Sequence, residues 1–339
     1  MSELHHGGCL NQAVRDWGIP RDQWLDLSTG INPVGWPVPA LPAAVWQRLP
    51  EPDDGLEHLL QDWFQAPPRA ALLAVPGSQW AIETLPRLRA PCRVGVPEPG
   101  YAEHRHHWAS AGHQLVPVPL AQLDEEDDRW LEPLDVLVWI NPNNPGGQTW
   151  PAAALQRWHR QLAARGGWLV VDEAFADGQP ALSLGPATGV PGLVVLKSLG
   201  KFFGLAGVRA GAVAADQALI DQLADRLGPW ALSGPARWVM ARALADRRWQ
   251  QATRQRLRAD SERLGRLLRE RGLTVTGSTL LFQTVHCAGA AELAQRLASG
   301  GILVRAFPPS AVLRFGLPGK EADWQRLDDA LAQWQAETR

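Results

Sequence analysis

Short apolar runs alternate with helical stretches between residues 71 and 214. Apolar runs bounded by turn residues are typical of buried strands, whereas apolar positions spaced three to four residues apart are typical of helices. The predicted strands are Ala71–Val75, Arg93–Val96, Gln114–Val118, Asp135–Ile140, Trp168–Val171, Leu193–Leu196 and Gly211–Ala214. The predicted helices are Gln79–Arg89, Ala102–Gly112 and Ala152–Arg165. This alternation predicts an α/β fold whose central sheet is mostly parallel and covered by helices.

The pattern changes on both sides of this region. The first 35 residues are irregular and rich in Gly and Pro, and we expect an arm laid over the rest. Pro235–Arg271 is a long Arg-rich helical stretch in which we expect a bend. Further elements are helices at Leu56–Phe64, Ala291–Ala298 and Glu321–Ala336 and strands at Thr279–Val285, Ile302–Ala306 and Val312–Phe315. We therefore predict an arm (1–35), a large α/β domain (36–230) and a smaller C-terminal α+β domain (231–339).

The amino-acid composition limits the classes of protein to which the chain can belong. The chain has 339 residues, of which 45% are hydrophobic and 20% charged, and its formal net charge is −2. A nearly neutral chain is not expected to bind nucleic acid or an anionic membrane surface through its net charge. No apolar run is long enough to span a bilayer. The N-terminus lacks the basic start and apolar stretch of a signal peptide, and the three cysteines are too far apart for a disulfide framework. We expect a cytoplasmic protein that binds a small molecule.

Polar segments follow several of the predicted strands, where ligands bind in open α/β sheets. Gly77-Ser78-Gln79 joins a strand to a helix, and its backbone N–H groups suit a phosphate. Residues 141–147 contain two Asn-Pro steps, which form either a plain turn or an amide contact to a ligand oxygen. Asp172 ends a buried strand, where a carboxylate needs a partner. That partner is either a basic side chain or a protonated ring nitrogen.

The segment from Lys197 to Gly211 contains two of the three lysines of the chain. Ser198 precedes Lys201 by three residues and Arg209 follows it by eight, so these side chains can hold a phosphate beside an amine. An aldehyde cofactor with a phosphate and a pyridine ring needs a lysine for the Schiff base, a carboxylate for the ring nitrogen and donors for the phosphate. The segments together therefore indicate pyridoxal phosphate chemistry.

Aromatic and histidine side chains lie near these segments in the sequence. Tyr101, the only tyrosine, follows a strand and either stacks on the ring of the cofactor or packs in the core. His104, His106 and His107 are interpreted as a solvated helix surface, because adjacent helix residues point in different directions and no carboxylate partner is evident. We expect no metal site.

Five motifs in a fixed order carry a resemblance to a known family. GSQ, PGY, NPNNPGG, DEAF and SxxKFFGLAGVRAG, within residues 77–211, resemble the pyridoxal-phosphate enzymes of the aspartate-aminotransferase fold. The resemblance implies fold type I, with a large cofactor-binding domain, and usually a homodimer. It implies Lys201 as the Schiff-base lysine, Asp172 on the pyridine nitrogen and Asn144 on the ring hydroxyl. The phosphate ligands that it implies are Ser78, Gln79, Ser198 and Arg209.

The two ends of the chain narrow the resemblance to one group within that family. His6-Gly7-Gly8 and the segment DLSTGINPVG at residues 26–35 are similar to threonine-phosphate decarboxylases of cobalamin synthesis. The similarity implies a carbon–carbon lyase that converts L-threonine O-3-phosphate to (R)-1-amino-2-propanol O-2-phosphate and carbon dioxide. Arginine suits such a doubly anionic substrate better than lysine. The implied substrate-binding residues are His6, Gly7, Gly30, Asn32, Asn144, Arg305 and Arg314.

Two other functions are compatible with parts of the sequence. A histidinol-phosphate-type aminotransferase shares the cofactor residues, but such enzymes often have Tyr at the position of Phe175, and the HGG segment also favours the decarboxylase. A non-catalytic effector-binding half of a transcriptional regulator would need a DNA-binding domain, for which there is no room before residue 70.

Overall fold

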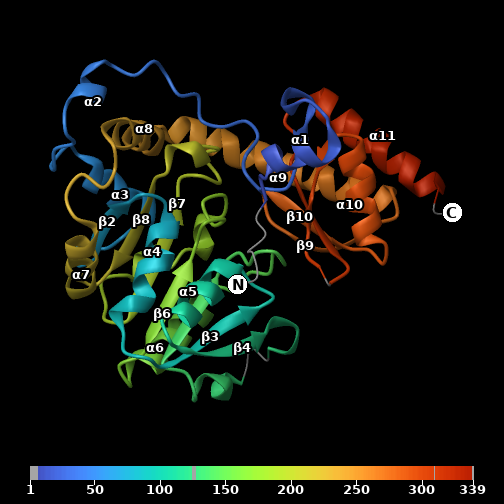
Figure 1. Ribbon diagram of the computed structural model, residues 1–339. Coiled ribbons are helices and arrows are strands. Elements are labelled where there is room, and N and C mark those ends of the chain that lie inside the picture. The colour runs from blue at the N-terminus through green and yellow to red at the C-terminus, as the bar shows by residue number, and fades with distance from the viewer. Residues whose placement is uncertain (1–6, 124–126, 309, 338–339) are drawn as a thin grey trace. The chain divides into compact units, whose positions relative to one another are not determined.

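The computed structural model describes residues 7–123, 127–308 and 310–337, and the chain forms two compact units (Figure 1). Unit 1 comprises the chain up to Gly35, Pro145–Gly147 and the chain from Ala252 onward. Unit 2 comprises Trp36–Asn144 and Gln148–Gln251. The predicted arm and C-terminal region thus belong to one unit, and the larger unit continues to Gln251 rather than ending at residue 230.

A seven-stranded sheet forms the centre of unit 2, in the order β2-β8-β7-β6-β5-β3-β4. Among the described strands of this sheet, β8 alone runs antiparallel to its neighbours, β2 and β7. The predicted α/β class with a mostly parallel sheet is therefore confirmed. The strands are β2 (Ala71–Val75), β3 (Arg93–Glu98), β4 (Gln114–Pro119), β5 (Val136–Ile140), β6 (Trp168–Asp172), β7 (Leu193–Ser198) and β8 (Gly211–Ala215).

Helices cover both faces of this sheet because successive strand residues point to opposite sides. Val138 of β5 belongs to the core cluster that includes Ile82, Trp108 and Leu219 of α4, α5 and α7. The next residue, Trp139, packs against the other side, where its ring lies 5.0 Å from that of Trp158 in α6. The helices of unit 2 are α2 (Ala44–Gln47), α3 (Leu56–Phe64), α4 (Ser78–Thr84), α5 (Ala102–Ser110), α6 (Ala152–Ala163), α7 (Gln217–Leu227) and α8 (Gly234–Ala245).

The register of the parallel strands aligns the ends at which the polar segments begin. Ile140 at the end of β5 pairs with Asp172 at the end of β6, and Asp172 pairs with Leu196 of β7. Ser198, at the end of β7, pairs with Gly211 at the start of antiparallel β8. Residues far apart in sequence therefore share one edge of the sheet.

The long Arg-rich stretch bends as predicted. Helix α8 packs against α3 and ends at Ala245, and α9 (Arg247–Glu270) starts two residues later. Asp246 between them accepts a hydrogen bond from the backbone N–H of Trp249 through its carboxylate (3.0 Å). Because α8 packs on α3, it belongs to unit 2, which explains why that unit extends beyond residue 230.

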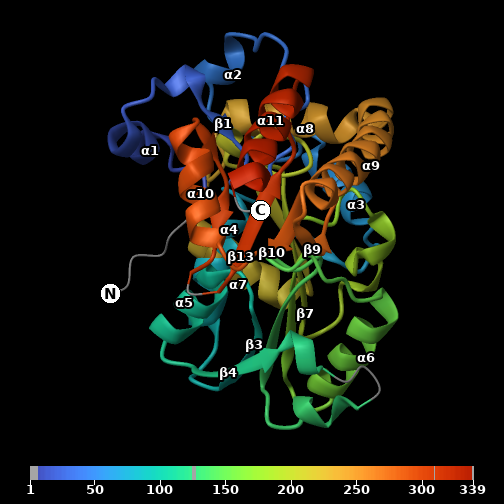
Figure 2. The ribbon, with the colours of Figure 1, turned by 90° about the vertical axis from the view of Figure 1, so that its right-hand side faces the viewer.

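Unit 1 is built on a four-stranded antiparallel sheet in the order β12-β13-β10-β9. Helix α10 contacts α1, α11 and β13 (Figure 2). The short strands β1 and β11 pair in parallel beside this sheet. The elements are α1 (Leu10–Trp17), β1 (Leu25–Asp26), β9 (Thr274–Ser278), β10 (Phe282–His286), α10 (Ala290–Ser299), β11 (Ile302–Leu303), β12 (Arg305–Ala306), β13 (Val312–Gly316) and α11 (Glu321–Glu337).

The arm is more ordered than the sequence predicts. It contains α1 and β1, and α1 buries Ala13 against Trp24 and Ala298. Leu10, Ala13, Val14 and Trp17 have the spacing of one helix face, and Leu10 and Val14 pack against the same cluster, so this helix was missed although its signal is present in the sequence. Strand β9 and helix α7 were not predicted either, and the helix expected at Gln79–Arg89 ends at Thr84, shortly before Pro86. No helix among the described residues is both long and apolar enough to cross a lipid bilayer.

A carboxylate ties the turn before β5 to helix α6. Asp128 accepts hydrogen bonds from Arg157 Nε (2.6 Å), Trp158 Nε1 (2.8 Å) and Gln161 Nε2 (2.7 Å). The Arg157 guanidinium, more than the other donors, holds the pKa of the Asp128 carboxyl below its ordinary value of 3.8. The ionised carboxylate therefore stabilises the fold.

Replacing Asp128 by Asn should lower the free energy of unfolding by about 2 kcal/mol near neutral pH, because charged hydrogen bonds are lost. A depressed pKa contributes stability that is present above the unfolded-state pKa and is lost as pH falls through the folded-state pKa. The difference between wild type and Asp128→Asn in urea unfolding should therefore shrink below about pH 4. A difference that stays constant at lower pH would contradict this assignment.

Candidate active site

Three of the predicted phosphate ligands converge where β7, β8 and α4 meet. Ser198 pairs with Gly211 across β7 and β8, and a Cβ on Gly211 would lie 2.7 Å from the backbone nitrogen of Ser78. A Cβ on Gly77 would lie 2.9 Å from Nη2 of Arg209. Glycine is needed at both positions because any side chain would fill this space. The result is a cradle with two hydroxyls, a guanidinium and backbone donors.

Arg209 adopts an unusual backbone conformation within this cradle. Its φ is +55°, in the left-handed region that side-chain-bearing residues rarely adopt. Its Nη1 donates to the backbone oxygen of Ala206 (3.2 Å), which fixes the guanidinium beside Gly77. Backbone strain of this kind persists where the surrounding structure determines it, and it concentrates at functional sites.

Asp172 lies at the buried end of β6 with an exposure of only 4%. Its Oδ2 accepts a hydrogen bond from His104 Nε2 (3.0 Å), and its Oδ1 accepts one from the backbone N–H of Ala174 (3.0 Å). Each carboxylate oxygen retains a second lone pair. The side chain is thus oriented and satisfied on one side while it keeps capacity for a further cationic or N–H partner.

The interpretation of the three histidines as a solvated surface is wrong for His104. This side chain is 1% exposed, and its ring packs edge-on against Tyr101 at 6.2 Å between centroids. Tyr101 and His104 are three residues apart at the start of α5, so they share a helix face. That spacing was the signal in the sequence, and it brings Tyr101, His104 and Asp172 into one group.

His107 also has a carboxylate partner, in contrast to the sequence interpretation. Its Nε2 lies 3.0 Å from Oε2 of Glu103, which also accepts a hydrogen bond from Gln79 Nε2 (2.7 Å). The side chain of Gln79 is therefore directed to Glu103, and a phosphate contact by Gln79 stays a prediction. The described residues contain no group of three or more His, Cys, Asp or Glu side chains suited to a metal ion.

The remaining two predicted cofactor residues also belong to unit 2. Nζ of Lys201 lies 5.4 Å from the ring centroid of Phe175, which follows Asp172 closely in the sequence. Asn144 is half-buried. The turn before it is held by Asn143, whose Nδ2 donates to the backbone oxygen of Pro99 (3.0 Å). All eight predicted cofactor ligands thus lie in one compact unit.

Most of the predicted substrate-binding residues lie in unit 1, where two arginines face each other. Arg305 of β12 pairs directly with Arg314 of β13. Arg314 is 5% exposed, and its Nη2 donates to the backbone oxygen of Ser28 (2.5 Å). Ser28 Oγ in turn accepts a hydrogen bond from the backbone N–H of Gly8 (2.7 Å). The arm and the arginine pair are therefore connected through Ser28.

Phe307 contacts both of these arginines. Its ring centroid lies 5.3 Å from the guanidinium carbon of Arg305 and 5.9 Å from that of Arg314. Like charges directly opposite each other in a sheet are destabilising, so an anion bound near both arginines would stabilise their pairing. Planar guanidinium groups suit carboxylate and phosphate oxygens in particular.

The other predicted substrate ligands differ in how they are placed. Gly30 lies in the arm with a φ of +59°. Asn32 Oδ1 accepts hydrogen bonds from the backbone N–H of Val34 (3.1 Å) and from Arg256 Nη2 (2.8 Å). His6 lies outside the described residues, and Asn144 belongs to unit 2. Substrate contacts by these residues stay predictions.

Comparison with known proteins identifies the class of protein. The family described as aminotransferase class I and II matches residues 45–331, which is most of the chain. The chain therefore belongs to the class I and II aminotransferase family, in agreement with the fold and with the lysine, aspartate and arginine of unit 2.

Within that family, the chain is similar to particular enzymes. It is 48% identical to the threonine-phosphate decarboxylase of Pseudomonas aeruginosa, over 97% of each chain. It is 39% identical to the threonine-phosphate decarboxylase of a Sinorhizobium species, over 98% of each chain. The crystal structure of histidinol-phosphate aminotransferase from Sinorhizobium meliloti in complex with pyridoxal-5'-phosphate superimposes with a TM-score of 0.81 at 22% identity. That match covers 99% of this chain and 96% of the other, and it shows the shared fold.

Replacing His104 by Phe keeps the ring but removes the donor to Asp172. The buried carboxylate would lose one of its two hydrogen bonds, so the free energy of unfolding should fall by about 2 kcal/mol. The matched control is His106→Phe, at an exposed position of the same helix, which should leave stability nearly unchanged. Equal stability of the two variants in urea unfolding would show that the His104–Asp172 hydrogen bond is not formed.

Proposed function

We propose that this protein decarboxylates L-threonine O-3-phosphate to (R)-1-amino-2-propanol O-2-phosphate and carbon dioxide, as a step of cobalamin synthesis, with pyridoxal phosphate as cofactor. The near full-length identity to two threonine-phosphate decarboxylases supports the substrate and the reaction. The structural observation that carries the proposal is the pair of half-buried Arg305 and buried Arg314, which is connected to the arm through Ser28.

The described residues of unit 2 fit pyridoxal phosphate. The cradle at Gly77 and Gly211 leaves space for a phosphate between Ser78, Ser198 and Arg209. The carboxylate of Asp172 has capacity for one more donor, as a protonated pyridine nitrogen requires. A lysine amine, Lys201, is present in the same unit. When bound, this cofactor supplies an electron sink for the bond that breaks at Cα of the substrate.

The residues of unit 2 have distinct tasks in this reaction. Lys201 would hold the cofactor through its amine when the substrate is absent. Asp172, an anion oriented by His104, keeps a proton on the pyridine nitrogen because an opposite charge favours the charged form. Tyr101 stacks on the ring, while Arg209 binds the phosphate.

The residues of unit 1 determine which substrate bond is broken. Arg305 and Arg314 bind the carboxylate and phosphate of the substrate through paired N–H donors. The cofactor would supply an electron sink to one bond of Cα, so a pocket that aligns the carboxylate with it would favour decarboxylation, whereas one that aligns Cα–H would favour transamination. Lys201 or a water then returns a proton to Cα.

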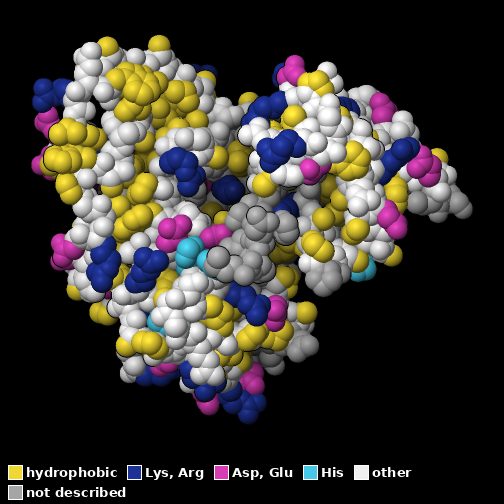
Figure 3. Space-filling model, viewed as in Figure 1, with side chains coloured by type: hydrophobic (Ala, Val, Ile, Leu, Met, Phe, Trp, Pro, Cys, Tyr) yellow, Lys and Arg dark blue, Asp and Glu magenta, His cyan; other side chains and the backbone are white. Residues whose placement is uncertain are grey.

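We also propose that the protein acts as a homodimer in the cytoplasm. Large apolar side chains are exposed at Trp46 (67%), Leu49 (61%) and Trp230 (59%). They line one groove with residues at the start of α8, and Figure 3 shows hydrophobic side chains gathered where Figure 1 has α2 and α8. Exposed apolar patches of this kind mark interfaces, and aromatic side chains are enriched there. The cysteine spacing fits a reducing compartment.

The reaction is tested by supplying the protein and pyridoxal phosphate with L-threonine O-3-phosphate, with and without 2-oxoglutarate. We expect carbon dioxide in both mixtures and no glutamate. Lys201→Ala should abolish turnover, because no other residue in the proposed mechanism holds the aldehyde carbon. Glutamate without carbon dioxide would instead assign a histidinol-phosphate-type aminotransferase activity, and normal turnover by Lys201→Ala would refute the role of this lysine.

The dimer is tested by light scattering of the eluting protein. Wild type should have twice the chain mass of 37.1 kDa. Trp46→Arg combined with Leu49→Arg places two charges in the apolar patch and should give the single-chain mass. Trp17→Arg, at another exposed aromatic position, is the matched control and should remain dimeric. A wild-type protein with the single-chain mass would exclude the proposed dimer.

A further inference from the structure

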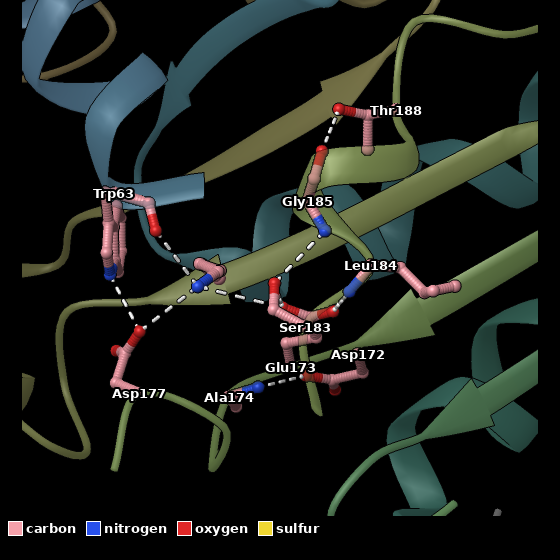
Figure 4. A network of polar contacts seen from close by, with 10 residues as sticks. Trp63, Asp172, Glu173, Ala174, Asp177, Ser183, Leu184, Gly185 and Thr188 are labelled. Atoms are coloured by element: carbon pink, nitrogen blue, oxygen red, sulfur yellow. Dashed lines mark hydrogen bonds and ion pairs between the residues drawn. The ribbon is translucent and has the colours of Figure 1, made fainter. Parts of the chain in front are cut away.

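A cluster of charges is buried in unit 2 on the side of the sheet that carries α3. Nζ of Lys197 lies 3.4 Å from Oδ1 of Asp177 and 3.7 Å from Oε2 of Glu173, and it donates to the backbone oxygen of Trp63 (3.2 Å) (Figure 4). The three charged side chains are at most 4% exposed. Lys197 is one of only three lysines in the chain, and the proposed mechanism does not use it.

Neutral donors complete the cluster. Glu173 accepts hydrogen bonds from Ser183 Oγ (2.6 Å) and from the backbone N–H of Leu184 (2.6 Å), and Trp63 Nε1 donates to Asp177 (2.7 Å) (Figure 4). Burial raises the pKa of the Glu173 carboxyl, and the charge of Lys197 opposes that shift. Buried ion pairs are often no more stabilising than apolar residues of the same size. Fold stability is therefore a weak reason for this cluster.

The cluster is placed directly behind the cofactor ligands. Ser198 follows Lys197 on β7, and Asp172 precedes Glu173 at the end of β6. Because strand residues alternate between faces, Ser198 lies on the same side as Leu196, which packs in the core with α4, α5 and α7, whereas Lys197 lies on the side of α3. Asp172 also faces α5, through His104.

The direct ladder between β6 and β7 ends at this level. The last described pair is Asp172 with Leu196, and the backbone N–H of Glu173 donates to the oxygen of Leu196 (2.9 Å), whereas the next residues of β7 pair with β8. The ion pair between Glu173 and Lys197 continues the connection by one further residue on each strand. The ion pair thereby joins the residues next to Asp172 and Ser198 in the sequence.

We propose that Lys197 is a positioning residue for the cofactor: its ion pairs with Glu173 and Asp177 fix the separation between Asp172 and the Ser198–Lys201 segment from the opposite face of the sheet. This inference rests on the proposed function, since it assumes that Asp172 and Ser198 bind one pyridoxal phosphate. Lys197 itself touches neither cofactor nor substrate.

The test measures the dissociation constant of pyridoxal phosphate by equilibrium dialysis against the cofactor-free protein. Lys197→Met should raise this constant at least about tenfold, because a small displacement of either ligand misplaces the groups that the cofactor needs. Lys197→Arg keeps the charge and should restore most of the affinity. The matched control is Arg157→Met, which breaks the ion pair with Asp128 elsewhere in unit 2 and should leave the constant unchanged.

Thermal unfolding of each cofactor-free variant separates positioning from general instability. The proposal would be overturned if Lys197→Met and Arg157→Met lost affinity for pyridoxal phosphate equally. It would also be overturned if folded Lys197→Met kept the wild-type affinity. If Lys197→Met does not fold, Glu173→Gln decides the question, because it keeps the shape and the acceptor for Leu184 but removes the charge. Its dissociation constant should rise in the same direction, and a wild-type value in that folded variant would refute the inference.

The outcomes also distinguish this inference from the proposed function. A wild-type protein that does not bind pyridoxal phosphate would refute both. A wild-type protein that binds it and releases no carbon dioxide from L-threonine O-3-phosphate would refute the proposed reaction, while weaker binding by Lys197→Met would still support the role of Lys197.

Discussion

Parallel pairing of β5, β6 and β7 is the constraint on which the candidate site depends. It aligns Ile140, Asp172 and Leu196 in one row, so the segments that follow these strands emerge at the same edge of the sheet. Parallel strands require long crossover connections, which explains why the chemically important residues are about 30 positions apart in sequence. Antiparallel β8 then returns the chain, so that Gly211 lies beside Ser198 and the phosphate cradle closes without a side chain in it.

Burying a carboxylate at the edge of a sheet is unfavourable unless it has polar partners, and here partners lie on both faces of the sheet. On one face, His104 and the backbone of Ala174 satisfy Asp172 without using all of its lone pairs. On the other face, Lys197 forms ion pairs with two carboxylates, Glu173 and Asp177, behind the same strand ends. A charge that stays ionised in such surroundings must be held by fixed partners, and the same partners fix its position.

The sequence predicts the α/β class and all seven strands of the sheet of unit 2, because most of these strands are short apolar runs with clear ends. It also predicts Asp172, Ser198 and Lys201 as a group, since each follows or ends such a run. It fails where the signal is not local, because the carboxylate partner of His104 is 68 residues away. The boundary between the units depends on α8 packing against α3, which no periodicity along the chain encodes.

The arginine pair of unit 1 explains why a doubly anionic substrate suits this chain. Antiparallel pairing places Arg305 opposite Arg314. The ring of Phe307 lies 5.3 Å from the guanidinium carbon of Arg305, and the ring of Phe282 lies 5.0 Å from that of Arg314. One edge of Arg314 is already committed to Ser28. In the proposed reaction, a carboxylate and a phosphate on one small molecule would match the charge of the two arginines. Under the proposed function, selectivity for an amino-acid phosphate would depend on the strand register as much as on the arginines themselves.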